Sequence, residues 1–129
     1  MPRFAQFVLI LLLALSPPMA RAADRVALVI GNSAYAHVPG LDNPANDASD
    51  IARTLEGLGY SVTLRMDLGR AGMIAALGDF RRTAFGAEQA IIYYAGHGIE
   101  VDRVNYLIPA AACPKDPQIA AALARARSN

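Results

Sequence analysis

The stretch Gln89-Ala90-Ile91-Ile92-Tyr93-Tyr94-Ala95-Gly96-His97-Gly98 decides the fold of this chain. Its apolar run is rich in β-branched and aromatic residues and is bounded by glycine, which predicts a strand buried on both faces. His97 then lies just past the carboxyl end of that strand. In open α/β sheets this edge is where catalytic groups and ligands gather, and the flanking glycines let a substrate approach closely. We therefore interpret His97 as a functional residue and not as a satisfied loop histidine.

The first 22 residues have the pattern of a secretory signal peptide. A basic residue, Arg3, precedes the apolar core at residues 7–15, and Ala20-Arg21-Ala22 matches a small-x-small cleavage site. The core is shorter than the roughly 20 residues that a membrane-spanning helix needs. We therefore predict cleavage after Ala22, a secreted or periplasmic location, and no membrane span after cleavage.

Composition narrows the function classes. The chain has 129 residues, 12 basic and 11 acidic; removing residues 1–22 takes away Arg3 and Arg21, which leaves 10 basic against 11 acidic residues and a net charge of −1. Such a balance implies no nucleic-acid partner. Cys113 is the only cysteine, so neither an internal disulfide nor a cysteine-based structural zinc site is expected. No motif in the sequence calls for a cofactor.

Two further runs predict strands that precede the histidine strand. They are Arg25–Ile30, an apolar run, and Tyr60–Leu64, which alternates and is rich in β-formers. The first is followed by Gly31-Asn32 and no Gly-x-Gly-x-x-Gly, so it lacks the phosphate-binding loop of a dinucleotide domain.

Two amphipathic helices are predicted between these strands. The first opens at Asn43-Pro44, where the asparagine side chain can cap free amides, and it closes at Gly57 and Gly59. The second spans residues 72–84. Their predicted buried faces are Ala48, Ile51, Ala52, Leu55 and Leu58 in the first helix, and Met73, Leu77 and Phe80 in the second.

The order strand, helix, strand, helix, strand predicts an α/β fold with three layers, α/β/α, a mainly parallel sheet and right-handed crossovers. Ile99–Val101 and Asn105–Ile108 predict a hairpin after His97. The tail, residues 110–129, is Ala-rich and predicts only a short helix around residues 118–126. A sheet that ends at the hairpin would leave an unpaired edge.

Several segments together resemble the caspase-like cysteine peptidases of the peptidase C14 family, and among them the bacterial metacaspase type. The resemblance covers Arg25 to Pro109, which we take as the extent of a p20-like domain at residues 23–109. It is carried by Val-Ala-Leu-Val-Ile-Gly-Asn at 26–32, Leu-Asp-Asn-Pro-Ala-Asn-Asp-Ala at 41–48, Leu-Gly-Tyr at 58–60, Tyr-Tyr-Ala-Gly-His-Gly at 93–98 and Asn-Tyr-Leu-Ile-Pro at 105–109.

This resemblance implies the large-subunit part of a caspase-hemoglobinase fold that acts on a peptide or protein substrate. His97 is then the imidazole that assists a catalytic cysteine, and the amide of Gly98 is the oxyanion donor. Asp47 matches the acidic residue of a substrate pocket, which implies a preference for Arg or Lys before the scissile bond. No metal site is implied.

The sequence also departs from that family. The family's nucleophile lies in an Asp-Ala-Cys-type segment on a later strand, and no such segment precedes Asn129. Arg103 stands where many relatives have a turn glycine, and Ala111 where an Asp commonly follows. Cys113 precedes Pro114 in the loose tail, so we do not interpret it as a substitute nucleophile. A truncated or frameshifted reading frame would explain these departures, and a genuinely short protein is the alternative. In either case we expect the chain to be inactive by itself.

Two interpretations remain open. The chain is the amino-terminal, catalytic-histidine part of a secreted cysteine endopeptidase, or it is a non-catalytic caspase-like module that binds a peptide or a partner. A third interpretation, a hydrolase in which His97 activates water, lacks an orienting acid. His37 is most simply a solvated loop residue, and pairing it with His97 in a metal site leaves the acidic ligands unspecified.

Overall fold

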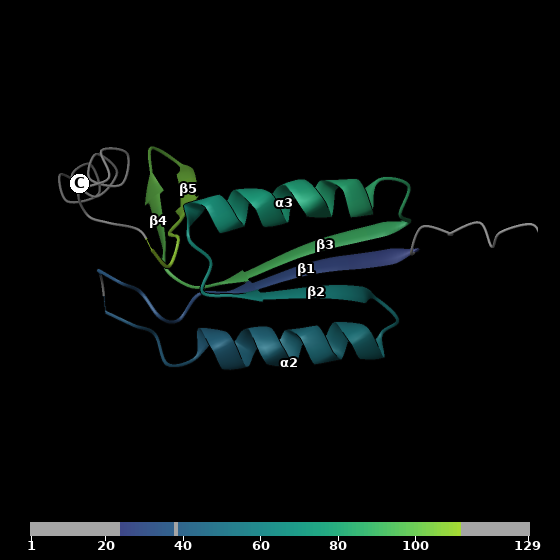
Figure 1. Ribbon diagram of the computed structural model, residues 1–129, viewed down its shortest axis with the longest axis horizontal. Helices are drawn as coiled ribbons and strands as arrows, with labels where there is room; N and C mark the ends of the chain where they lie inside the picture. Colours follow the sequence, from purple (N-terminus) through teal and green to yellow (C-terminus); the bar gives the residue numbers. More distant parts are fainter. Residues whose placement is uncertain (1–23, 38, 112–129) are drawn as a thin grey trace, which may run out of the picture.

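The structure, a computed structural model, describes residues 24–37 and 39–111. The predicted signal peptide, the predicted helix in the tail and Cys113 lie outside the described residues. In chain order the elements are β1 (Arg25–Gly31), α2 (Pro44–Gly57), β2 (Ser61–Met66), α3 (Arg70–Ala84), β3 (Gln89–Ala95), β4 (Gly98–Val101) and β5 (Val104–Leu107), as Figure 1 shows.

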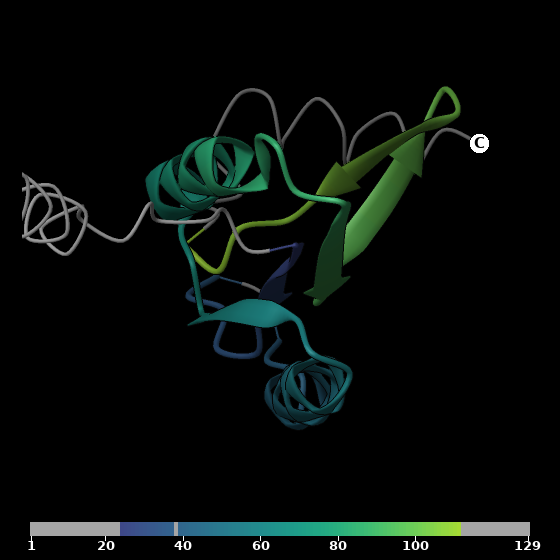
Figure 2. The same ribbon diagram turned by 90° about the vertical axis from the view of Figure 1, so that its right-hand side faces the viewer.

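The first three strands form a parallel sheet in the order β2-β1-β3. One helix covers each face, α3 on one and α2 on the other, which is plain when the sheet is viewed end-on (Figure 2). The predicted α/β class with three layers is therefore confirmed. Because parallel strands all end at the same edge, the loops after β1, β2 and β3 gather at one end of the molecule.

The central strand β1 contributes side chains to two core clusters, one on each face of the sheet. Its side chains alternate between the faces, as the period of a strand requires. Val26, Leu28 and Ile30 pack with Ala76 and Phe80 of α3. On the other face the core cluster is Val29, Ala48 and Ala52. Each residue from Val26 to Ile30 is at most 1% exposed.

Strand β3 is not buried on both faces, so that prediction was wrong. Ile92 is 54% exposed, and Gln89 and Ala90 are exposed as well. In the part of the chain that the structure describes, β3 pairs with β1 alone, which leaves its other edge open. Helix α3 packs on β1, so the α3-side face of β3 is left largely uncovered.

Two residues of the predicted helical faces are also exposed. Leu58 lies just past the end of α2 and is 59% exposed, and Leu77 in α3 is 40% exposed. Leu58 is exposed because the helix ends before it, whereas Leu77 lies beside the buried stripe that Met73, Ala76 and Phe80 form on α3.

At its amino end α2 is capped by a different residue from the one predicted. At its carboxyl end it is closed by a glycine, as predicted. Asn43 makes no side-chain cap bond; instead the hydroxyl of Ser33 accepts the amide of Ala45 at 2.9 Å. At the carboxyl end Gly59 adopts a positive φ of 85°, and the amide of Tyr60 bonds the carbonyl of Leu55. This is the Schellman arrangement, which favours glycine.

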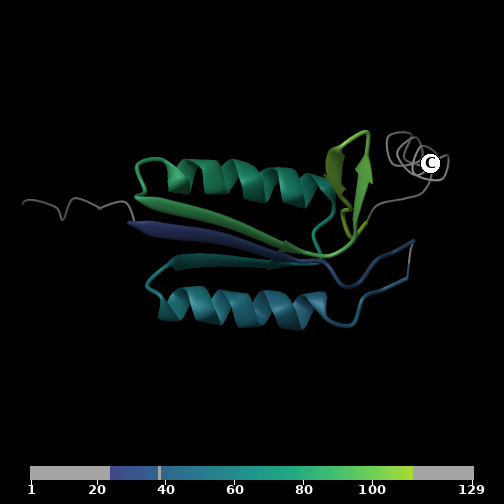
Figure 3. The same ribbon diagram turned by 180° about the vertical axis from the view of Figure 1, so that it is seen from behind.

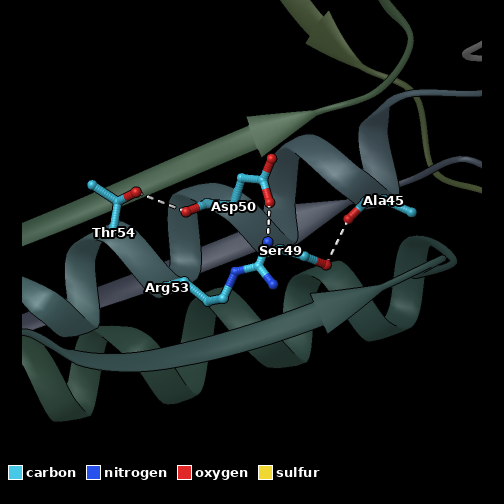
Figure 4. Close-up of polar contacts among 5 residues, drawn as sticks. All are labelled: Ala45, Ser49, Asp50, Arg53 and Thr54. Atoms are coloured by element: carbon cyan, nitrogen blue, oxygen red, sulfur yellow. Dashed lines mark hydrogen bonds and ion pairs between the residues drawn. The ribbon is translucent and has the colours of Figure 1, made fainter.

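The solvent face of α2 is held by local contacts (Figure 4). Arg53 pairs with Asp50 one turn away, and the hydroxyls of Ser49 and Thr54 donate to the carbonyls of Ala45 and Asp50. Exposed pairs of this kind stabilise a helix by only a few tenths of a kcal/mol. The packed face therefore determines where the helix lies.

The predicted hairpin is confirmed as β4 and β5, which pair antiparallel at the end of the sheet where β3 ends (Figure 3). Its strands start one residue earlier than predicted. The two turn residues, Asp102 and Arg103, have φ of 52° and 63°. Two consecutive positive φ angles define a type I′ turn, in which glycine is favoured at the second position, so Arg103 occupies it at some conformational cost. No helix among the described residues is long and apolar enough to span a membrane.

We predict that Gly31→Ala destabilises the fold. A Cβ at this position would meet the Cβ of Ala48 at 2.7 Å and the carbonyl oxygen of Pro44 at 2.8 Å, so α2 would have to move off the end of β1. The expected loss is about 1–3 kcal/mol, the usual cost of overpacking. Urea unfolding measures it.

Gly78→Ala is the matched control, because a Cβ there has no neighbour within 4 Å. Within helix α3 this change should stabilise by about 0.5–1 kcal/mol. Equal stability of the two variants would contradict the packing of β1 against α2.

Candidate active site

His97 lies just past the end of β3, between that strand and β4, and is partly exposed. Its place is the one expected from the sequence. The loop after β1, which carries Tyr35 and Pro39, reaches the same end of the sheet and contacts it. The site is thus built by two loops that are about 60 residues apart in the chain.

The imidazole of His97 is held in a defined tautomer. Its Nε2 atom lies 3.0 Å from the carbonyl oxygen of Pro39. A carbonyl oxygen only accepts, so Nε2 carries the hydrogen and donates it. In the neutral ring Nδ1 is then unprotonated, with its lone pair available to take a proton. This is the state that a general base requires.

Tyr35 contacts both the ring and the backbone of His97. The two rings meet edge to face, with centroids 4.6 Å apart and an interplanar angle of 61°. The hydroxyl of Tyr35 accepts the backbone amide of His97 at 2.7 Å.

Tyr94, at the end of β3, supports the carbonyl side of the same loop. Its hydroxyl lies 3.0 Å from the carbonyl oxygen of His97 and 2.9 Å from that of Ile108, and 3.3 Å from the hydroxyl of Tyr35. Burial raises the pKa of Tyr94 well above its ordinary value. Tyr94 therefore keeps its proton and remains a donor.

Gly96 lies against both tyrosine hydroxyls. A Cβ there would come within 2.6 Å of the hydroxyl oxygens of Tyr35 and Tyr94. Only a residue without a side chain permits this close approach, which gives the glycine before His97 a structural reason.

The amide of Gly98 is placed for an acceptor outside the hairpin. Ile108 donates its amide to the carbonyl of His97 at 3.0 Å, which places the two residues opposite each other at a hydrogen-bonding position just beyond the β4–β5 ladder. Bonded and non-bonded pairs alternate along an antiparallel ladder. Gly98, paired with Leu107, falls on a non-bonded position, and its N–H points away from β5.

Asp47 lies in the first turn of α2, the helix that begins at the end of the sheet where β3 ends (Figure 1). Its carboxylate is exposed and makes no hydrogen bond or ion pair within the described residues. The structure thus brings Asp47 to the same end as His97 without a contact between them. His37 is exposed, as predicted, and no cluster of three or more metal-ligating side chains occurs in residues 24–37 and 39–111.

A cavity of about 640 Å³ lies at the opposite end of the sheet and is remote from this chemistry. It is lined by Asp24, Arg25, Gly59, Tyr60, Ser61 and Glu88. These residues precede or begin the strands or lie in the turn before β2, whereas His97 follows a strand. We therefore place the candidate active site at the carboxyl edge and not in this cavity.

Sequence reasoning missed the partners of His97. In the sequence, Tyr35 and Pro39 carry no signal beyond that of loop residues, and Tyr94 none beyond that of a strand former. Their spacing in the chain gives no signal of contact. The sequence does place a tyrosine in each of the two segments, Tyr35 in the loop and Tyr94 in the strand. A buried tyrosine hydroxyl needs a hydrogen-bond partner, and this is the signal that could have pointed to the contacts.

Comparison with known proteins agrees with this fold. Residues 24–124 match the caspase domain family, Peptidase_C14, so the chain belongs to the caspase domain family and is a caspase-like peptidase domain. The match continues past Pro109, and the boundary of the tail stays a prediction.

Two relatives are mucosa-associated lymphoid tissue lymphoma translocation protein 1 of Homo sapiens and its homolog of Mus musculus. Each is 33% identical to this chain over 88 residues, which is 68% of the chain. The aligned segment spans only 11% of either relative.

We predict that Tyr94 ionises late in an alkaline titration followed by phenolate absorbance. A raised folded-state pKa means that the unfolded chain loses this proton first. The contribution of Tyr94 to stability is therefore complete below the ordinary tyrosine pKa of about 10 and falls as the pH rises toward the folded value. Tyr94→Phe should lack the late step and this part of the stability loss. Ionisation of Tyr94 at the ordinary pH would contradict the buried, donating hydroxyl.

Proposed function

We propose that this chain supplies the catalytic-histidine part of a caspase-type cysteine endopeptidase, of the bacterial metacaspase type, which hydrolyses peptide bonds in protein substrates. The observation that carries the proposal is the hydrogen bond from Nε2 of His97 to the carbonyl of Pro39. It leaves Nδ1 free to act as a base at the edge of the sheet where loops present catalytic groups.

The chemistry follows from these groups. A cysteine thiol with its free pKa near 8.5 is mostly protonated at neutral pH. Nδ1 of His97 takes the thiol proton, and the Pro39 carbonyl then stabilises the imidazolium through the Nε2 hydrogen. The thiolate attacks the scissile carbonyl carbon, and His97 returns the proton to the leaving amine. The N–H of Gly98 is the donor for the oxyanion, a contribution of about 3 kcal/mol in the transition state.

The open edge of β3 supports a place for the nucleophile. A strand added parallel to β3 would end at the same edge as β1, β2 and β3, beside His97. Ile92 on the exposed face and the uncharged sequence of β3 suit such a neighbour. The cysteine on that strand is not among the described residues, and Cys113 is not our candidate for it.

Substrate preference and export belong to the same proposal. Asp47 is exposed at the catalytic end of the domain and makes no ion pair among the described residues, so its carboxylate can pair with an Arg or Lys side chain of the substrate.

Residues 1–22, which lie outside the described residues, support a secreted or periplasmic protein that has no membrane span after cleavage.

A binding module is the alternative, and the same open edge of β3 favours it. An extended peptide can pair with an exposed strand by backbone hydrogen bonds alone. Such a module would bind peptides without cleaving them, and its function would not need Nδ1 of His97.

We predict that a chimera that continues this chain after Ala111 with the cysteine-bearing strand of a metacaspase hydrolyses peptides. His97→Ala should lower kcat/KM roughly 10²–10⁴-fold, because a general base is lost. The unextended chain from residue 23, which still carries Cys113, should be inactive. Hydrolysis that survives His97→Ala would remove the catalytic role, and peptide binding without hydrolysis would favour the binding module.

We predict that the same chimera cleaves after Arg or Lys and not after Asp. Asp47→Ala should abolish that preference, while Asp50→Ala, a carboxylate one turn further along α2, should leave it unchanged. A desolvated carboxylate paired with a cationic side chain is the physical reason. Profiling on a peptide library decides, and a preference that Asp47→Ala does not alter would remove the pocket role.

A further inference from the structure

The loop between β1 and α2 makes two contacts with the imidazole of His97. Tyr35 meets one side of the ring edge to face, and Pro39, four residues further along the same loop, accepts the Nε2 hydrogen. One segment of backbone therefore carries both groups that fix the orientation of the ring. The hydroxyl of Tyr35 adds a third contact, to the amide of His97 itself.

The hydrogen bonds around Tyr35 run in one direction. The amide of His97 donates to the hydroxyl oxygen of Tyr35. Tyr94 has its hydrogen aimed at the carbonyls of His97 and Ile108, so in the 3.3 Å contact between the hydroxyls Tyr35 is the donor. The hydroxyls of Tyr35 and Tyr94 therefore each donate one hydrogen bond and accept another. A series of hydrogen bonds of this kind has one direction and fixes the orientation of both hydroxyls.

The backbone on both sides of Tyr35 is anchored. A carboxylate oxygen of Asp67 accepts the amides of Ser33 and Ala34 at 2.8 and 2.9 Å. The amide of Ala36 donates to the carbonyl of Ala110 at 3.0 Å. Tyr35 thus stands on a short segment that is tied to two other loops, so its hydroxyl and ring are fixed points for His97.

We propose that Tyr35 is a positioning residue for His97. Its hydroxyl fixes the backbone of the histidine and its ring fixes the plane of the imidazole, so that Nε2 stays on the Pro39 carbonyl and Nδ1 stays free. That this serves peptide hydrolysis rests on the proposed function; the geometric role itself does not.

The experiment compares three variants of the full chain by NMR. Tyr35→Phe keeps the ring and removes the hydroxyl, and Tyr35→Leu removes both. Tyr60→Phe is the matched control, because it loses a hydroxyl that bonds Gln89 at 2.6 Å at the far end of the sheet. A dispersed amide spectrum establishes that each variant folds.

Two readouts separate the hydroxyl from the ring. Hydrogen exchange of the His97 amide should be about tenfold faster in both Tyr35 variants and unchanged in Tyr60→Phe, because the partly buried bond from this amide is lost only in the first two. The ring-current shift of the His97 imidazole protons should persist in Tyr35→Phe and vanish in Tyr35→Leu. Unaltered exchange in Tyr35→Phe, or an unaltered imidazole in Tyr35→Leu, would overturn the proposal.

Activity distinguishes this proposal from the function on which it rests. In the chimera Tyr35→Leu should lower kcat at least tenfold with KM little changed, since positioning acts on the reacting group and not on substrate binding. A chimera without activity, together with the NMR effects, would remove the peptidase function and leave the positioning role. An active chimera with unchanged kcat in Tyr35→Leu would remove the positioning role from catalysis.

Discussion

The arrangement of the loops at the carboxyl edge of the sheet depends on the hydrogen bonds of Asn32, whose side chain is fully buried. It follows the central strand directly, accepts the amide of Leu68 at 2.9 Å, and donates toward the carbonyls of Leu68 and Ile108 at 3.3 and 3.5 Å. Its own amide bonds the carbonyl of Ala95. One residue thus joins the loops after β1 and β2 and the last residue of β3 to the segment after β5. Because a buried polar group that loses its partner costs about 1–3 kcal/mol, these loops are held as a unit.

Much of the fold follows from local patterns that the sequence displays. The apolar run at Val26–Ile30 and the helical spacing on α2 each require one buried surface, and the order of elements leaves few ways to arrange them. The same logic failed at Ile92, because an apolar run indicates a strand without showing how many neighbours that strand has. It failed at Leu58 because the helix ends one residue before it, and at Leu77 because helical spacing marks the centre of a buried stripe and not its margins.

The position of His97 could be predicted, because a strand that stops at Gly-His-Gly brings the histidine to a sheet edge whatever its partners are. Tyr35 and Pro39 could not be, since their bonds to His97 depend on how two loops pack across about 60 residues of chain. The same reason explains Asn43, whose expected cap on α2 is provided by the hydroxyl of Ser33. Membership of the caspase domain family agrees with the fold, and the assistance that His97 gives to a cysteine is our proposal. The contacts around the ring explain how this chain holds that histidine.

The proposed role of His97 as a base depends on which nitrogen of its ring carries the proton. Nitrogen-15 chemical shifts of the imidazole, measured on the wild-type chain above the pH at which the ring becomes neutral, report this directly. The chain has two histidines, so His37→Gln assigns the signals. The geometry predicts hydrogen on Nε2 and a bare Nδ1. A proton on Nδ1, or an even mixture of the two tautomers, would contradict it.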